Sequence, residues 1–404
     1  MTPFLASLFC ESSSQGINPR MRPIAAWSLG RRDVWRAGAL AGGVLALGCR
    51  RRPPAPVPAD ALALHRECLV VDLHVDTFLW VRLFGYDIGR RHENLLPSAS
   101  YAWQADLPRL KEGGVGAVGF GIVVSPRQVR PELLRPLKML SWYDRQRGID
   151  AVLGTLDLMH DAAHRYADQF TLVRNGSELR AARDAGKIAG LPCLEGAHGI
   201  EGSLAHVRTA YERGLRSIGL VHFQADEAGY PTTVAAFDGQ GLTEFGRTLI
   251  GEMERLHMIV DLAHLNDAGV ADALATTRRP FIVSHTACRA LYPHRRNLTD
   301  DQIRAVADHG GVIGIMFEGS VLAEGGGDID RVLDHFDHAI KVGGEDVVAI
   351  GSDYDGFITP AVGLEDVTTM PRLTAGLLAR GHRPDTVRKI LGENALRVLT
   401  DICG

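Results

Sequence analysis

A histidine and an aspartate near the start of the chain are spaced so that they could bind one metal ion together. His74 and Asp76 lie two residues apart in a short apolar run, and in a β-strand residues i and i+2 point to the same face. An imidazole and a carboxylate on one face are typical ligands of a divalent cation. The spacing alone is only moderately specific, so its meaning depends on the rest of the chain.

Other apolar runs of the chain also end in residues that can bind a metal ion or transfer a proton. A single histidine at a strand end is more often a hydrogen-bonded structural residue, and a single aspartate is more often a helix cap or an ion-pair partner. However, six of eight candidate strands end in a residue that can bind metal or transfer a proton, which favours one shared site. Besides His74 and Asp76, these residues are Glu195, His222, His264, His285 and Asp353.

Two metal ions can be assigned to these ligands. We expect His74 and Asp76 on one ion, His264 and His285 on a second, and Glu195 as the bridge between them. Two cations about 3.5–4 Å apart can share a hydroxide and hold both the attacking and the substrate oxygen of a hydrolytic reaction. The ligand types suit Zn2+, with Mn2+, Co2+ and Fe2+ left open. The six cysteines include no Cys-x-x-Cys pair, so no thiolate zinc site is expected.

The elements that position these residues are indicated by alternating patterns. From Cys68 onward, short β-branched runs alternate with longer amphipathic segments, which is typical of repeated βα units. Segments 242–257 and 299–310 are expected to be helices, and Thr299 with Gln302 resembles a capping box. The expected strands are 69–75, 115–124, 188–195, 215–222, 258–264, 280–285, 311–317 and 347–353.

Eight such units predict an α/β fold, a (β/α)8 TIM barrel. Because metal-binding residues end its strands, we expect a barrel of the metal-dependent hydrolase (amidohydrolase-like) type. Barrel enzymes carry their catalytic groups at the C-terminal ends of the strands, where the residues named above lie. An open doubly wound sheet is the alternative, which is less favoured because no glycine-rich phosphate loop follows the first strand.

The composition agrees with a folded enzyme. The 404 residues are 46% hydrophobic and 23% charged, as in ordinary globular proteins. The net charge is -4 and the basic residues are scattered outside one short N-terminal cluster, so no nucleic-acid partner is expected.

The first 59 residues have the character of an export signal. Arg31 and Arg32 precede an apolar run, 37–48, of about 12 residues, which is too short to span a bilayer since that needs about 20. It suits a twin-arginine-like signal peptide. Cys49 after Leu-Ala-Leu-Gly resembles a lipoprotein cleavage site, and a Pro-Ala run at 53–59 resembles a tether.

We therefore expect 1–59 to be a largely disordered signal and tether, and 60–404 to be the barrel domain. The protein is expected to be exported to the periplasm or cell envelope and to be membrane-tethered through Cys49. A start at Met21 instead of Met1, and a disordered basic tail in place of a signal, remain alternatives.

Longer stretches around these residues resemble the membrane dipeptidase (renal dipeptidase) family of zinc peptidases. The likeness runs from about residue 66 to 400 and includes LEGAHGIEG, VDLAH, VSHTA, RRNLTDDQIRAVADHGGVIGIMF, GSDYDGF and GENALRVL. The resemblance implies that His74, Asp76, Glu195, His264 and His285 bind two Zn2+ per chain.

The resemblance also implies roles outside the metal ligands. It implies that His222 binds and polarises the scissile carbonyl, that Arg296 binds the free carboxylate of a dipeptide, and that Asp353 transfers a proton. The implied activity is hydrolysis of dipeptides, including those with a C-terminal D-residue, by a metal-bridging hydroxide. A homodimer is implied by the resemblance alone.

Two other functions remain open from the residues. Another binuclear amidohydrolase, such as a lactonase, deaminase or phosphotriesterase-like enzyme, is less favoured because many of these use a carboxylated lysine as the bridge and no strand end here offers one. A non-catalytic exported metal- or peptide-binding lipoprotein is the second. His198, Asp261 and Asp355 are not expected to be ligands, and His65 is expected to be an ordinary surface histidine.

Overall fold

A computed structural model describes residues 56–96, 100–128 and 144–404, which belong to one structural unit, Pro56–Gly404. Most of the predicted signal and tether, including Arg31, Arg32 and Cys49, lies outside the described residues. Among the described residues, no helix is both long and apolar enough to cross a membrane.

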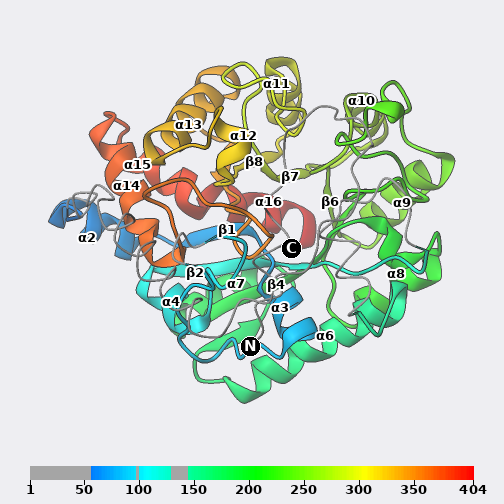
Figure 1. The fold of residues 1–404 in the computed structure, drawn as a ribbon, viewed down its shortest axis with the longest axis horizontal. Helices are drawn as coiled ribbons and strands as arrows, with labels where there is room; N and C mark the ends of the chain where they lie inside the picture. Colours follow the sequence, from blue (N-terminus) through cyan, green and yellow to red (C-terminus); the bar gives the residue numbers. More distant parts are fainter. Residues whose placement is uncertain (1–55, 97–99, 129–143) are drawn as a thin grey trace, which may run out of the picture. The chain divides into compact units, whose positions relative to one another are not determined.

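The strands of this unit form a closed parallel ring (Figure 1). The order is β2-β1-β9-β8-β7-β6-β5-β4, and β4 closes the ring by pairing with β2 from Ala117↔Ala189 to Ile122↔Leu194. A further short strand, β3, pairs with the first part of β4. The strands are β1 (Val70–Val75), β2 (Val115–Ile122), β3 (Phe170–Leu172), β4 (Ile188–Leu194), β5 (Ser217–Gly219), β6 (Ile259–Asp261), β7 (Ile282–Thr286), β8 (Val312–Ile315) and β9 (Val348–Ile350).

The ring confirms the predicted (β/α)8 barrel, and its closure excludes the open doubly wound alternative. All eight predicted strands are present, although most are shorter than expected, and β3 was not predicted. The strands are buried almost throughout because neighbouring strands, helices and the barrel interior leave little of either face exposed, as is usual in parallel sheets.

Helices follow the strands and pack outside the ring (Figure 1). Segments 242–257 and 299–310 are confirmed as helices, and the capping box of Thr299 and Gln302 is present. The helices are α2 (Ala59–Glu67), α3 (Thr77–Phe84), α4 (Leu107–Glu112), α6 (Gly148–Arg165), α7 (Gly176–Asp184), α8 (Leu204–Glu212), α9 (Glu244–Arg255), α10 (Asp267–Thr276), α11 (Asp300–Asp308), α12 (Gly319–Leu322), α13 (Ile329–Gly343), α14 (Met370–Ala379), α15 (Pro384–Arg388) and α16 (Asn394–Cys403).

The last helix, α16, closes one end of the barrel. Its apolar residues, among them Val398 and Leu399, join a buried cluster with Val71, Ala117 and Val312 from the first halves of their strands. This packing fills the N-terminal end with apolar side chains. The functional site can therefore lie at the opposite end of the barrel, at the C-terminal ends of the strands, where the chemically active residues were predicted.

Candidate metal centre

Each predicted site residue except Arg296 lies at or just beyond the C-terminal end of its strand. His74 is the penultimate residue of β1 and Asp76 follows that strand, Glu195 follows the last residue of β4, and His285 lies within β7. The other three, His222, His264 and Asp353, lie three residues beyond the ends of β5, β6 and β9. Strands far apart in the sequence thus deliver these side chains to one end of the barrel.

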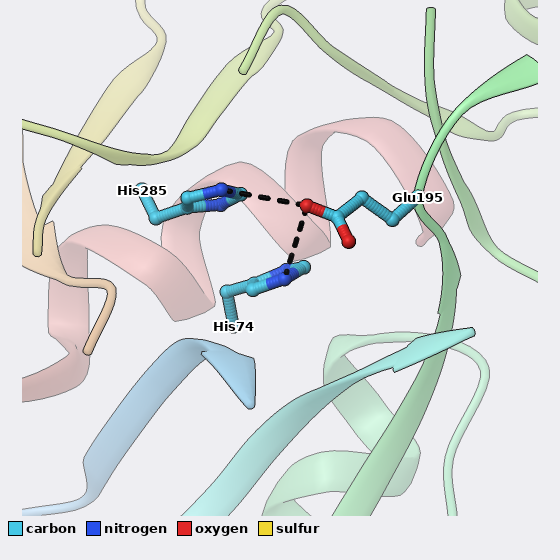
Figure 2. A group of neighbouring side chains, drawn as sticks. All are labelled: His74, Glu195 and His285. Carbon is cyan, nitrogen blue, oxygen red and sulfur yellow. Dashed lines mark ion pairs between the residues drawn. The ribbon is translucent and has the colours of Figure 1, made fainter. Parts of the chain in front are cut away.

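Glu195 lies at the centre of this group. Its Oε1 atom is 3.0 Å from His264 Nε2, 3.5 Å from His285 Nε2 and 3.6 Å from His74 Nε2. Figure 2 shows the rings of His74 and His285 directed at this one oxygen from two sides. The second oxygen, Oε2, is 3.3 Å from His222 Nε2. One carboxylate therefore faces four imidazoles.

The remaining distances place the two aspartates beside His74. Its Nε2 atom is 3.4 Å from Asp76 Oδ1 and 4.0 Å from Asp353 Oδ1. On the other side of the centre, the Nε2 atoms of His264 and His285 are 2.9 Å apart, a separation suited to two ligands of one ion. The structure brings all seven predicted side chains into one cluster.

Three subsets of this cluster could each hold a cation. They are His74 with Glu195 and His285, Glu195 with His222 and His264, and His74 with Asp76 and Asp353. Glu195 belongs to two of the subsets, one with His74 and His285 and the other with His222 and His264. His222, predicted as a substrate-binding residue, also lies within ligand reach.

Several atoms of the cluster fit a cation because they are buried without a hydrogen-bond partner. His74 Nε2, Asp76 Oδ1 and Glu195 Oε2 are in this condition, and none of the three residues is more than 6% exposed. Buried carboxylates that lack partners are costly, and in proteins such groups are paired or coordinate metal ions. The donor set of imidazoles and carboxylates suits Zn2+.

The protonation tendencies of the side chains also fit metal binding. Burial lowers the pKa of His222, His264 and His285 well below its usual value, so these rings are neutral and can offer a lone pair. Burial, together with Asp76, raises the pKa of Glu195. Burial lowers the pKa of His74, but Asp76 and Glu195 raise it, and the result lies well above the usual value. The excess negative charge around His74 attracts a cation.

The backbone of the centre is held in unusual conformations. His264 has φ 67° and Asp353 has φ 65°, both in the left-handed region that non-glycine residues rarely adopt. The loops that carry the aspartates are joined, because Asp353 N donates to His74 O at 3.1 Å and Asp76 N donates to Tyr354 O at 2.8 Å. The surrounding structure thus fixes positions that isolated loops would avoid.

Arg296 is a buried cation beside this cluster. It is 8% exposed, and its Nη2 atom donates to the carbonyl oxygen of His285 at 3.2 Å. Burial lowers its pKa, whereas Asp353 and Glu195 raise it. Within the described part of the chain it forms no ion pair, so its charge is available to an anionic ligand.

The residues that were not expected to be ligands have other partners. Asp261 accepts hydrogen bonds from Ala263 N and Ser284 N, next to His264 and His285. Asp355 accepts from Thr77 Oγ1 at 2.5 Å and from Gln104 N at 2.7 Å. Through these hydrogen bonds the two aspartates stabilise the segments that carry the site residues.

His198 also has a structural partner, because its Nε2 atom lies 2.9 Å from Val124 O. The prediction for His65 is wrong. It is buried on α2 between Thr374 Oγ1 and the carbonyl of Gly113, and its place on the apolar face of α2 beside Ala61 and Leu64 could have indicated this.

One supporting residue was missed by sequence analysis. Asp72 is fully buried in β1, and its Oδ1 atom accepts from His74 N at 3.2 Å and from Ser352 N at 2.9 Å. Burial raises its pKa to about 6. Asp72 lies two residues before His74, so strand alternation already places both on one face and could have identified it.

Comparisons with known proteins find similar sequences among the dipeptidases. A sequence model described as membrane dipeptidase (peptidase family M19) matches residues 59–403. Dipeptidase verJ of Clonostachys rogersoniana is 33% identical over 298 residues, which cover 74% of this chain and 75% of that relative.

Solved structures give the same result. A metallopeptidase from Rhodobacter sphaeroides, liganded with a phosphinate mimic of the dipeptide L-Ala-D-Ala, is 30% identical with a TM-score of 0.70, covering 83% of this chain and 99% of its own. The dipeptidase AC, a metallopeptidase of family M19, is also 30% identical, with a TM-score of 0.71 and the same coverage. An amidohydrolase from Pseudomonas aeruginosa shares the fold at 22% identity, with a TM-score of 0.69 over 85% of this chain and 99% of its own.

Proposed function

This chain belongs to the membrane dipeptidase family of metal-dependent peptidases, and from this premise we propose that it hydrolyses dipeptides with two zinc ions held at the candidate metal centre. The observation that carries the proposal is the position of Glu195, whose Oε1 atom lies within 3.0 to 3.6 Å of three imidazole nitrogens from three other strands. Because the chain belongs to this family, we no longer favour the alternative functions of a lactonase, a deaminase or a non-catalytic binding protein.

We assign the ligands as the sequence predicts. His74 and Asp76 would hold one ion, His264 and His285 would hold the other, and Glu195 would serve both. When bound, two such ions polarise a substrate carbonyl and lower the pKa of water.

Asp353 is proposed to transfer the proton. Its carboxyl lies 4.0 Å from His74 Nε2, and burial raises the pKa of this carboxyl well above its usual value, which makes it a stronger base than an exposed aspartate. It takes the proton of the attacking water and returns it to the leaving nitrogen of the peptide bond. Its side chain is 15% exposed, more than the ligands His74 and Glu195, which leaves it accessible to substrate.

Two further residues are proposed to bind the substrate. His222 is neutral because burial lowers its pKa, so one ring N–H can donate to the scissile carbonyl as negative charge develops there. Arg296 offers a planar pair of N–H donors to the free carboxylate of the C-terminal residue. This contact limits substrates to peptides that end at that residue.

The relative bound to a mimic of L-Ala-D-Ala supports acceptance of a C-terminal D-residue. A panel of L,L- and L,D-dipeptides, given to metal-restored protein and to Asp353→Asn, tests the proposal. We expect hydrolysis of both classes by the unmodified protein, and a rate lower by about 100-fold or more in Asp353→Asn, since general acid–base groups contribute about 10²–10⁴-fold. If no dipeptide is hydrolysed when two metals are bound, the proposal is wrong.

Export is a separate part of the proposal, supported by Arg31, Arg32 and the apolar run at 37–48. We propose that the protein reaches the periplasm or cell envelope and is tethered through Cys49. Cell fractionation tests this: Arg31→Lys with Arg32→Lys should retain the protein inside, and Cys49→Ser should release it from membranes. Unchanged distribution of both variants would contradict it.

Light scattering tests the proposed homodimer.

A further inference from the structure

Two segments beside the candidate metal centre share an unusual backbone conformation. One is the 353–358 loop, which follows β9 and begins with Asp353, and the other is the 101–104 segment, which precedes α4. Among the described residues, eight that are not glycine have a positive φ, and five of these lie in the two segments. Such residues cost free energy and persist only where contacts hold them. The five are Tyr101 (φ 73°), Trp103 (φ 63°), Asp353 (φ 65°), Asp355 (φ 69°) and Phe357 (φ 63°).

The side chains of Gln104 and Asp355 join the two segments. Gln104 N donates to Asp355 Oδ1 at 2.7 Å, and Asp355 N donates to Gln104 Oε1 at 2.6 Å, so each side chain accepts from the backbone of the other residue. Both residues are fully buried. In addition, Tyr101 N donates to Ile358 O at 2.6 Å. The 101–104 segment therefore holds the 353–358 loop near its middle and at its end.

Asp355 is bonded through all four of its polar atoms. Besides the two bonds with Gln104, its Oδ2 atom accepts from Thr77 Oγ1 at 2.5 Å, and its carbonyl oxygen accepts from Trp80 Nε1 at 2.8 Å. Thr77 and Trp80 belong to α3, which begins directly after the proposed ligand Asp76. A buried carboxylate that is bonded in this way can fix the loop, whereas it is not accessible to a substrate.

The carboxyl of Asp353 lies against the same loop. Gly356 N donates to Asp353 O at 3.1 Å and closes a turn that contains Asp355. A Cβ atom at Gly356 would clash with Asp353 Oδ1, so this oxygen packs directly on the turn. A shift of Asp355 therefore moves the surface on which the Asp353 carboxyl lies.

We propose that Gln104 is a positioning residue for proton transfer: paired with Asp355, it holds the 353–358 loop in its left-handed conformation and thereby places the carboxyl of Asp353. Gln104 is fully buried and acts through Asp355 without touching the substrate. This inference rests on the proposed dipeptidase function and on the role of Asp353, and it adds a residue on which that step depends.

Steady-state kinetics of Gln104→Met test the role. Methionine has nearly the volume of glutamine but offers no oxygen to Asp355 N, so one bond of the pair is lost. We expect kcat to fall about tenfold or more, since a displacement of about 1 Å can cost about 100-fold. KM should change less than about twofold, because Arg296 and His222 lie on other loops. Zinc content should equal that of the unmodified protein, because neither Gln104 nor Asp355 is a proposed ligand.

A double-mutant cycle with Asp353→Asn separates positioning from a general loss of structure. If Gln104 acts through Asp353, Gln104→Met should lower kcat less than about twofold once the Asp353 carboxyl is replaced, because residues that act as a unit have non-additive effects. A loss of about tenfold in both backgrounds would show that Gln104 supports the site in general, and the proposal would be wrong.

Two variants of Asp355 test the other half of the pair. Asp355→Asn keeps an oxygen for Gln104 N and can donate to Thr77 Oγ1, so we expect kcat to stay within about threefold. Asp355→Ala loses both contacts and should lower kcat about tenfold or more. If Asp355→Asn were as slow as Asp353→Asn, Asp355 would itself transfer the proton, and the positioning role of Gln104 would be refuted.

Asn394→Leu is the matched control. Its buried amide donates to Glu345 O at 2.8 Å and to Val348 O at 2.9 Å, at the N-terminal end of β9. Removing these bonds should lower the melting temperature and leave kcat unchanged. A buried amide that only stabilises the fold is thereby distinguished from Gln104.

The outcomes separate this inference from the function on which it rests. If dipeptides are hydrolysed and Gln104→Met retains the full kcat, the inference is wrong and the dipeptidase function stands. If no dipeptide is hydrolysed, both are wrong. Melting curves of each variant check that it folds, and the comparison of Asp355→Ala with Asp355→Asn retains the test if Gln104→Met does not fold.

Discussion

Around Glu195, four imidazoles lie within 3.0 to 3.6 Å of one carboxylate, and several of the atoms involved have no other partner. A carboxylate in this position contributes to both proposed ions, whereas each histidine contributes to one. The residues of the centre should therefore differ in how many ions their loss releases.

Metal content measures this difference. We expect Glu195→Gln to retain less than one zinc ion per chain, because an amide is a weak ligand and both sites lose a charge. His264→Ala should retain about one ion, held by His74 and Asp76. Elemental analysis of dialysed protein checks both variants. Two ions in Glu195→Gln would contradict the bridging role.

Arg296 is proposed to act through a single contact, with the free carboxylate of the substrate. Arg296→Ala should raise KM for dipeptides about 10- to 100-fold, since hydrogen bonds between charged groups contribute about 1.5–3 kcal/mol. Steady-state kinetics with a dipeptide and its C-terminal amide provide the readout: the variant should discriminate less between them. An unchanged KM would refute the carboxylate role.

At the scale of elements, β2 makes room for the metal centre through a glycine. A Cβ atom at Gly121 would lie 1.9 Å from Asp76 Oδ1 and 3.2 Å from His74 Cε1. The strand therefore passes so close to the ligands of β1 that no side chain fits between them.

We expect Gly121→Ala to displace Asp76 and to lower zinc content and activity at least tenfold while the barrel still folds, because one local contact is affected. Gly251→Ala on α9, where a Cβ would have no neighbour within 4 Å, is the control and should retain full activity. Zinc analysis and circular dichroism measure the two effects, and normal zinc content in Gly121→Ala would contradict the prediction.

The loop after β5 carries the buried carboxyl group of Asp226. Asp226 accepts from Ala228 N and Gly229 N of its own loop and from His198 N of the loop after β4. Burial raises its pKa to about 8, from an ordinary value near 3.8. Between these two values the folded chain keeps a proton that the unfolded chain has lost.

It follows that this residue makes the folded state less stable as pH rises from about 4 to 8. In Asp226→Asn, which stays neutral, that contribution disappears, so melting temperature should fall less steeply over this range than in the unmodified protein. Thermal unfolding at pH 5, 6, 7 and 8 gives the comparison. Parallel pH profiles of the two proteins would show that Asp226 is not the source.

At the scale of the whole molecule, the two barrel ends differ in the side chains that fill them. The N-terminal end is filled by the apolar side chains of α16, whereas the C-terminal end gathers carboxylates and imidazoles, several of whose atoms lack a hydrogen-bond partner. Metal ions that bind only the folded state stabilise it by mass action.

Chelation should therefore lower the melting temperature by about 5 °C or more, and added Zn2+ should restore it. Melting curves recorded before chelation, after it and after zinc addition measure the effect. A protein that melts at the same temperature in all three conditions would not depend on the metal centre for stability.

The sequence by itself determined the eight strands, two of the helices and the seven side chains at the strand ends. It could do so because β-branched apolar runs, capping residues and strand-end positions are local properties of the chain. It also determined the family, through motifs that span almost the whole barrel.

Only the tertiary structure decided which atoms meet. The place of Glu195 among four imidazoles, the burial of His65 and the room left by Gly121 depend on contacts between residues tens to hundreds of positions apart. Such contacts follow from ring closure between β2 and β4, which no local pattern specifies. Distances and burial, and therefore pKa shifts, are fixed when the ring closes.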